Sequence, residues 1–179
     1  MAIRSKPVLI FSAFIVALLH ILWEHFNGGV LTHHLLADAN NPGFSNWWGL
    51  LSLPALTWAA LTAIEKRNPK ESGDFKAAGI SALQKKYFFA GLIFSLLASL
   101  LWEFDQEGVL QYFILLPWAL SFFLRIYLPE TTLGFVLGMT YTFGGVLPIL
   151  FSVVIQGVGF LIYSIVYRGG KRLLEKLLK

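Results

Sequence analysis

The chain has no cysteine in its 179 residues. This absence excludes a disulfide framework, a thiolate metal site and a cysteine nucleophile. Charged residues are also scarce, at 13% of the chain, whereas a soluble domain carries about 25%. There is no G-x-S-x-G serine elbow, no H-E-x-x-H zinc motif and no glycine-rich phosphate motif. The familiar signatures of serine hydrolases, metalloproteases and nucleotide-binding proteins are therefore missing.

Hydrophobic residues, by contrast, make up 56% of the chain, and the mean hydropathy is +0.67. Several apolar stretches approach the roughly 20 residues that cross a bilayer. The first of them runs to Trp23 without an A-x-A cleavage site, so we interpret it as a retained helix and not as a signal peptide. The composition predicts an all-α polytopic membrane protein in which residues 1–179 form a single membrane domain.

Breaks in the apolar pattern divide this domain into about six transmembrane helices, paired as three hairpins. Asn27-Gly28-Gly29 ends the first helix, Ser45 or Asn46 suits the N-cap of the second, and Gly144-Gly145 separates the last two. The hydrophilic residues 65–86 form a loop, and the cationic residues 168–179 form an amphipathic tail on the membrane surface. The predicted helices are 7–26, 47–64, 87–104, 109–128, 132–144 and 146–167.

All 14 Lys and Arg residues fall on one side of this arrangement. The positive-inside rule then places both termini in the cytoplasm of a bacterial-type inner (plasma) membrane. The net charge of +4 is accordingly assigned to lipid headgroups and not to nucleic acid. The opposite, outer side carries all four histidines and five acids, and it has no Lys or Arg. These acids are Glu24, Asp38, Glu103, Asp105 and Glu107.

An internal repeat accompanies the acids. Residues 18–31 align with residues 97–110, with seven identities in fourteen positions. The identities include a Trp-Glu pair, which is Trp23-Glu24 in one copy and Trp102-Glu103 in the other. Both copies end a helix at the outer side, which favours parallel repeats about an axis along the membrane normal. The alternative interpretation is that Trp-Glu marks a helix end in the aromatic belt.

The histidine-rich segment offers metal ligands. His20 and Glu24 lie four residues apart on a predicted helix, so their side chains share one face. LTHHLLADA, starting at Leu31, favours a short interfacial helix, on which His34 and Asp38 would have the same spacing. Two imidazoles and two carboxylates suit a divalent metal, with zinc as the first choice. The predicted metal ligands are His20, Glu24, His34 and Asp38.

A metal with an open coordination position would activate water for hydrolysis. We assign catalytic roles to Glu24, Glu103 and His33, with a lipid-like or small-molecule substrate reaching the outer face from the bilayer. The leading hypothesis is a metal-dependent hydrolase or transferase. One alternative is a proton- or cation-coupled transporter or channel that uses Glu24, Glu103 and His20, and that works as a homo-oligomer because six helices are few for a transporter. Another is a non-enzymatic sensor or complex subunit with structural metal or haem.

Overall fold

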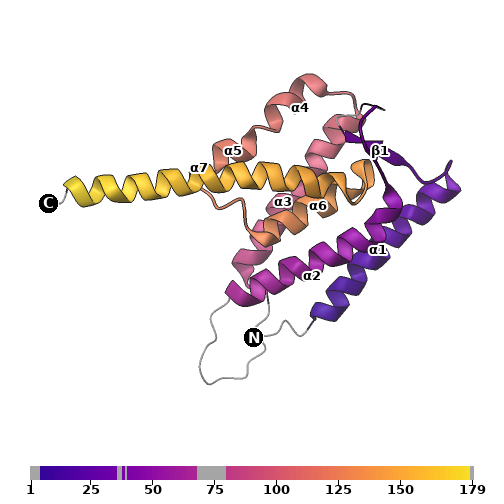
Figure 1. The fold of residues 1–179 in the computed structure, drawn as a ribbon, viewed down its shortest axis with the longest axis horizontal. Helices are drawn as coiled ribbons and strands as arrows, with labels where there is room; N and C mark the ends of the chain where they lie inside the picture. The colour runs from indigo at the N-terminus through magenta and orange to yellow at the C-terminus, as the bar shows by residue number, and fades with distance from the viewer. Residues whose placement is uncertain (1–4, 36–37, 39, 68–79, 178–179) are drawn as a thin grey trace.

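The computed structural model describes residues 5–35, 38, 40–67 and 80–177. In these ranges the chain is helical apart from turns and one short β-hairpin (Figure 1). The prediction of a helical protein with membrane-length helices is confirmed, whereas six spans and an internal repeat are not. Four stretches are long and apolar enough to cross a membrane: Lys6–Phe26, Asn46–Arg67, Ala82–Glu103 and Leu147–Tyr167.

The first helix, α1 (Lys6–Phe26), agrees with the prediction at both ends. Pro7 lies in its first turn, where a fixed φ and a missing N–H do no harm. The helix is capped at Asn27. Gly28 and Gly29 follow with φ of +122° and +108°, a region that glycine adopts without steric cost. The chain can therefore reverse direction immediately after α1.

The second helix, α2 (Gly49–Arg67), follows a single 3₁₀ turn, η2 (Asn46–Trp48), and packs along α1. Lys6 at the start of α1 ties the two helices together at one end. Its ammonium group lies 2.8 Å from a carboxylate oxygen of Glu65 and donates to the hydroxyl of Thr62 at 2.8 Å. The start of α1 and the end of α2 therefore lie side by side.

The closest helix pair is α3 (Ala82–Glu103) with α6 (Pro129–Phe143). Small residues face each other across this contact. A Cβ at Gly134 would collide with a backbone carbonyl of α3, and one at Gly138 would collide with the side chain of Ser95. Such small-residue contacts bring helix backbones together where the hydrophobic effect offers little driving force. This pair forms the centre of the bundle.

The predicted loop at 65–86 is shorter than expected at both ends. α2 continues to Arg67, and α3 begins at Ala82 instead of residue 87. Ser81 and Gln84 form a capping box, in which each side chain bonds the other residue's backbone N–H, and this fixes the start of α3. The intervening residues 68–79 lie outside the described ranges.

The single helix predicted at 109–128 is wrong. Its place is taken by α4 (Glu107–Phe113) and α5 (Leu116–Leu120), neither of which is long enough to cross a membrane. Pro117 lies in the first turn of α5, because proline cannot donate the backbone bond that a continuous helix requires. The chain then runs irregularly until Pro129 starts α6.

The last helix, α7 (Leu147–Leu177), begins within one residue of its predicted start and runs well past its predicted end. It follows the break at Gly144, which has φ of +70°. The amphipathic tail predicted at 168–179 is not a separate helix, because α7 continues through it to Leu177. Residues 178 and 179 lie outside the described ranges. Figure 1 shows α7 leaving the other helices as it approaches the C-terminus.

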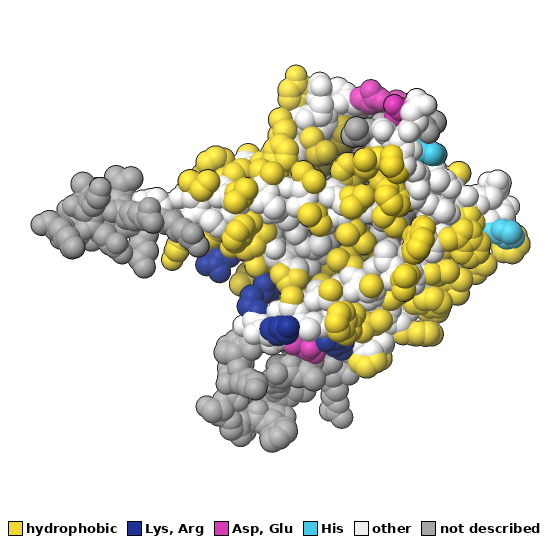
Figure 2. Space-filling model, viewed as in Figure 1, with side chains coloured by type: hydrophobic (Ala, Val, Ile, Leu, Met, Phe, Trp, Pro, Cys, Tyr) yellow, Lys and Arg dark blue, Asp and Glu magenta, His cyan; other side chains and the backbone are white. Residues whose placement is uncertain are grey.

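Charges of opposite sign gather at opposite ends of the molecule. Figure 2 shows Lys and Arg side chains along the lower edge of the visible face, with an acidic side chain among them, and a further acidic group at the upper edge. Apolar side chains lie between the two edges. We call the lower edge the basic end; it comprises the start of α1, the end of α2 and the starts of α3 and α6. We call the other the acidic end; it comprises the ends of α1 and α3, the start of α4 and the hairpin. Large apolar side chains such as Phe11 and Val153 are 63% and 66% exposed, as expected for helices that face lipid.

Candidate functional site

Glu24 is the buried carboxylate of the acidic end, with 7% of its surface exposed. It lies in the last turn of α1 and is surrounded by donors. The backbone N–H of Leu31 donates to Oε2 at 3.3 Å, and the side-chain amide of Asn46 donates to Oε1. The imidazole Nε2 of His20 lies 3.4 Å from Oε1. These contacts offset the cost of removing a carboxylate from water, and they confirm the predicted pairing of His20 with Glu24.

Asn46 joins this pair to a second histidine. It lies in η2, is 3% exposed, and its amide nitrogen is 3.3 Å from Nε2 of His33 as well as bonded to Glu24. An amide nitrogen has two hydrogens and no acceptor capacity. His33 therefore accepts at Nε2 and carries its proton on Nδ1, as a neutral ring. His20, Glu24, Asn46 and His33 form one connected group, which we call the polar cluster.

The environment of His33 favours this neutral form. The ring is half-buried in the hairpin, outside the four apolar helices. Burial lowers the pKa of His33 below its ordinary value, and the charge of Glu24 opposes this by raising the pKa, while His20 lowers it further. Burial is the largest of the three effects, because a charged imidazole loses more hydration than a neutral one.

The β-hairpin brings His33 to the cluster. Strands β1 (Thr32–His34) and β2 (Gly43–Ser45) are antiparallel, and His33 is paired with Phe44. Successive strand residues point to opposite faces, so His33 and its neighbour cannot both reach the cluster. The interfacial helix predicted for this segment is wrong at residues 32–34; residues 36, 37 and 39 lie outside the described ranges.

The strand removes the basis for pairing His34 with Asp38. His34 Nδ1 instead lies 2.8 Å from the backbone carbonyl of Asn41, within the hairpin. Asp38 is exposed and accepts from the backbone and side-chain nitrogens of Asn40, both at 2.9 Å. Of the four predicted metal ligands, His20 and Glu24 are in contact, whereas His34 and Asp38 join neither that pair nor each other. Among the described residues, no three His, Cys, Asp or Glu are grouped so that they could hold a metal ion.

Glu103, the predicted counterpart of Glu24, has different surroundings. Its side chain is exposed at the end of α3. The tryptophans of the two Trp-Glu pairs also differ, since Trp102 packs on Phe143 with ring centroids 5.3 Å apart and Trp23 is 59% exposed. A hairpin follows the first copy, whereas α4 begins within the second copy, at Glu107. The two copies thus have unlike environments.

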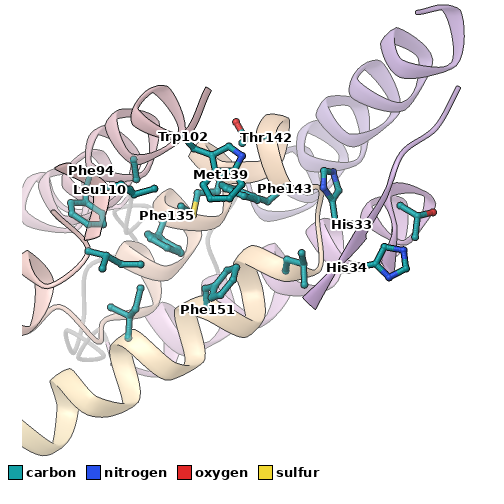
Figure 3. A pocket seen from close by; sticks show the side chains of 15 residues that line it. His33, His34, Phe94, Trp102, Leu110, Phe135, Met139, Thr142, Phe143 and Phe151 are labelled. Atoms are coloured by element: carbon teal, nitrogen blue, oxygen red, sulfur yellow. The ribbon is translucent and has the colours of Figure 1, made fainter. Parts of the chain in front are cut away.

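A cavity of about 550 Å³ opens beside the polar cluster. Its walls come from α3, α4, α6 and α7, with β1 at one side (Figure 3). The lining is mostly apolar and aromatic, and Figure 3 shows His33 beside Phe143 at one end, with Phe94 and Leu110 at the other. The ring centroids of His33 and Phe143 are 6.5 Å apart. The cavity combines an apolar body with a polar end, as small-molecule sites commonly do.

One polar atom of the cavity lining has no partner. Thr142, near the end of α6, is 8% exposed, and its hydroxyl makes no hydrogen bond within the described chain. Buried polar atoms are nearly always satisfied, so an unsatisfied hydroxyl in a cavity wall points to a ligand or water. Sequence reasoning missed Thr142, because an isolated threonine in an apolar helix gives no distinguishing signal.

The corner between α6 and α7 holds the cavity against the cluster. A Cβ at Gly144 would collide with the side-chain oxygen of Asn46, and Ser52 on α2 donates to the carbonyl of Gly145 at 3.1 Å. Asn46 therefore packs on the cavity wall while it bonds Glu24 and His33. The sequence alone predicts only that Ser45 or Asn46 caps the second helix.

Comparison of the chain with protein-family models, with curated proteins and with solved structures yields no match. The acidic end combines a buried polar cluster with an apolar cavity, and His33 belongs to both.

Proposed function

We propose that this protein binds a lipid-like amphiphile in the cavity at its acidic end, with the polar group of the ligand at His33. The observation that carries the proposal is the position of His33, which belongs to the polar cluster and also lines the cavity. The apolar walls suit a hydrocarbon chain, and the hydroxyl of Thr142 and the Nδ1–H of His33 suit an oxygen function. The ligand would enter sideways from the membrane.

The charge of the acidic end restricts the class of ligand. No Lys or Arg occurs in residues 7–65, 87–124 or 126–167, the stretches that contain this end. The same end carries Glu24 and Glu103, with further acids at the start of α4. An anionic headgroup would meet repulsion without a compensating cation. We therefore propose a neutral or cationic amphiphile, such as an ester or an alcohol.

We propose further that the protein catalyses hydrolysis or group transfer on the bound amphiphile. A neutral imidazole that donates a hydrogen bond can polarise a carbonyl oxygen and stabilise the negative charge that develops on it. His33 is suited to this role because Asn46, which is itself bonded to Glu24, holds the Nε2 side of its ring. In hydrolysis of an ester, water would add to the carbonyl carbon, the bond to the alcohol oxygen would break, and a proton from the water would pass to that oxygen, which gives an acid and an alcohol.

A zinc-dependent version of this reaction is less well supported by the donor set. The amide nitrogen of Asn46 lies between the carboxylate of Glu24 and the ring of His33, and an amide N–H is a donor, not a metal ligand. Transport through Glu24, Glu103 and His20 also has no observation in its favour, since Glu103 is exposed and separate from the polar cluster.

We place the acidic end on the outer side of a bacterial-type inner membrane, with both termini in the cytoplasm, by the positive-inside rule. The broken segment after α4 supports this arrangement. Arg125 donates to the hydroxyl of Tyr163 at 3.1 Å, well along α7 and away from the acidic end. The chain would thus return to the basic end before α6 begins.

Native mass spectrometry of the detergent-purified chain tests the binding. We would titrate a neutral monoacylglycerol and an anionic lysophospholipid that have the same acyl chain. We expect the neutral amphiphile to bind and the anionic one to bind more weakly. His33→Ala should weaken binding, whereas His25→Ala should not, because His25 is an exposed histidine at the end of α1 that does not line the cavity.

A second variant pair tests whether the cavity is the site. Ile114 lines the cavity and is 39% exposed, and its neighbour Leu115 is 46% exposed and does not line it. Ile114→Trp should block binding, and Leu115→Trp should leave it unchanged. Equal binding by all four variants would refute the proposed site. Binding without release of fatty acid would refute the hydrolase form alone.

A further inference from the structure

A second cavity, of about 480 Å³, lies toward the basic end between α1, α2, α3 and α6. Its walls are mostly apolar, and residues from four helices contribute to them. Two lining residues are only partly covered, since Val16 is 46% exposed and Phe89 is 53% exposed. The cavity is therefore a groove that opens sideways on the lipid-facing surface.

The polar part of the groove lies at the basic end. Lys85, in the first turn of α3, lines the groove and is exposed. Glu130 also lines it, but its carboxylate is 3% exposed and accepts from Arg67 at 2.6 and 2.8 Å. The negative charge of Glu130 is thus balanced by Arg67, and the charge that the groove presents to a ligand is that of Lys85.

Positive charge is in excess around this end. Five basic residues of the described chain stand against two acidic ones, Glu65 and Glu130, which leaves a surplus of three. The segment 68–79 contributes two lysines and two acids by sequence, so it does not alter the balance. The five basic residues are Lys6, Lys66, Arg67, Lys85 and Lys86.

We propose that this groove binds one anionic phospholipid, with an acyl chain between α1 and α3 and the phosphate at Lys85. Basic residues beside a membrane surface attract anionic lipids by charge, and an apolar groove next to them holds the chain. The site is distinct from the cavity at the acidic end, which has no Lys or Arg nearby and is proposed to disfavour anions. The two ends of the molecule would therefore select lipids of different charge.

Lys85 and Lys86 provide a matched pair for the headgroup. Both are exposed lysines near the start of α3, but only Lys85 lines the groove. In native mass spectrometry of the full chain, phosphatidylglycerol should bind more tightly than phosphatidylcholine with the same acyl chains. Lys85→Ala should reduce the affinity for phosphatidylglycerol about fivefold, the effect of one lysine at an anionic surface. Lys86→Ala should change it much less.

Val16 and Val8 provide the pair for the acyl chain. Both are exposed valines on α1, at 46% and 65%, but only Val16 lines the groove. Val16→Trp should displace both phospholipids, and Val8→Trp should displace neither. Equal affinity for the two phospholipids, or equal losses in Lys85→Ala and Lys86→Ala, would overturn the proposal. Loss of a dimer instead of a lipid in Val16→Trp would overturn it in favour of a second copy of the chain.

Discussion

Replacing Asn46 with Asp tests the polar cluster most directly. The substitution keeps the shape of the side chain but exchanges the donor nitrogen for an acceptor oxygen. In the wild type, the amide nitrogen of Asn46 donates to the carboxylate of Glu24 and to Nε2 of His33. In the variant, an oxygen that cannot donate would face both of these acceptors. Two buried carboxylates in contact cannot both stay ionised, so one must take up a proton or the hairpin must leave α1.

The size of the stability loss in Asn46→Asp follows from the burial of the two side chains. Glu24 and Asn46 are 7% and 3% exposed, so solvent screens the new repulsion weakly. Breaking a buried, charged contact in this way costs about 3–5 kcal/mol, which corresponds to roughly 6–20 °C in the melting temperature of a chain of this size.

The assay is thermal unfolding of the purified chain in detergent at pH 7, followed by tryptophan fluorescence. Asn40→Asp is the control, because Asn40 also bonds a carboxylate, that of Asp38, but both residues are exposed. Exposed charges interact weakly, so this variant should melt close to wild type. The same melting temperature for Asn46→Asp and Asn40→Asp at pH 7 would refute the described cluster.

Three further predictions concern the hairpin, the helix packing and the metal. Because burial holds the pKa of His33 below the ordinary value of 6.5, its contribution to hairpin stability should be complete above pH 6.5. It should decline as the pH falls through the lowered pKa. Amide exchange in residues 32–34 should show this loss of hairpin stability in the wild type, whereas the hairpin stability of His33→Gln should not change with pH. Gly138→Ala should destabilise the chain by about 1–3 kcal/mol through overpacking against Ser95, while Gly157→Ala, where a Cβ has open space, should be neutral or slightly stabilising in thermal melts. Elemental analysis after chelator-free purification should find no stoichiometric metal, and stoichiometric metal lost in His20→Ala and His33→Ala but kept in His34→Ala would contradict the assigned role of Asn46.

Local signals account for what could be predicted. The apolar runs behind α1, α2, α3 and α7 are long enough to show a membrane helix without any knowledge of packing. The end of α1 could be predicted because Asn27-Gly28-Gly29 is a break that works in any context. The pairing of His20 with Glu24 could be predicted because a helix places residues four apart on one face.

The errors arose where distant segments compete with local preference. Residues 32–34 suit a helix by pattern, yet they form a strand because residues 43–45 return to pair with them. This change of period brings His33, and not His34, to the polar cluster through its contact with Asn46. The sequence predicts one helix around Pro117, because some membrane helices tolerate a proline within an apolar run. In the structure the helix is broken there into α4 and α5.

The sequence by itself determined the class of the protein, the lengths of its apolar helices and the separation of basic from acidic residues along the chain. These properties depend on composition and short-range spacing, which do not depend on how the helices pack. Only the tertiary structure decided that Asn46 joins Glu24 to His33, that Thr142 lines a cavity, and that Glu103 stays apart from Glu24. Each of these depends on residues that are far apart in the chain and meet only when the helices and the hairpin pack together.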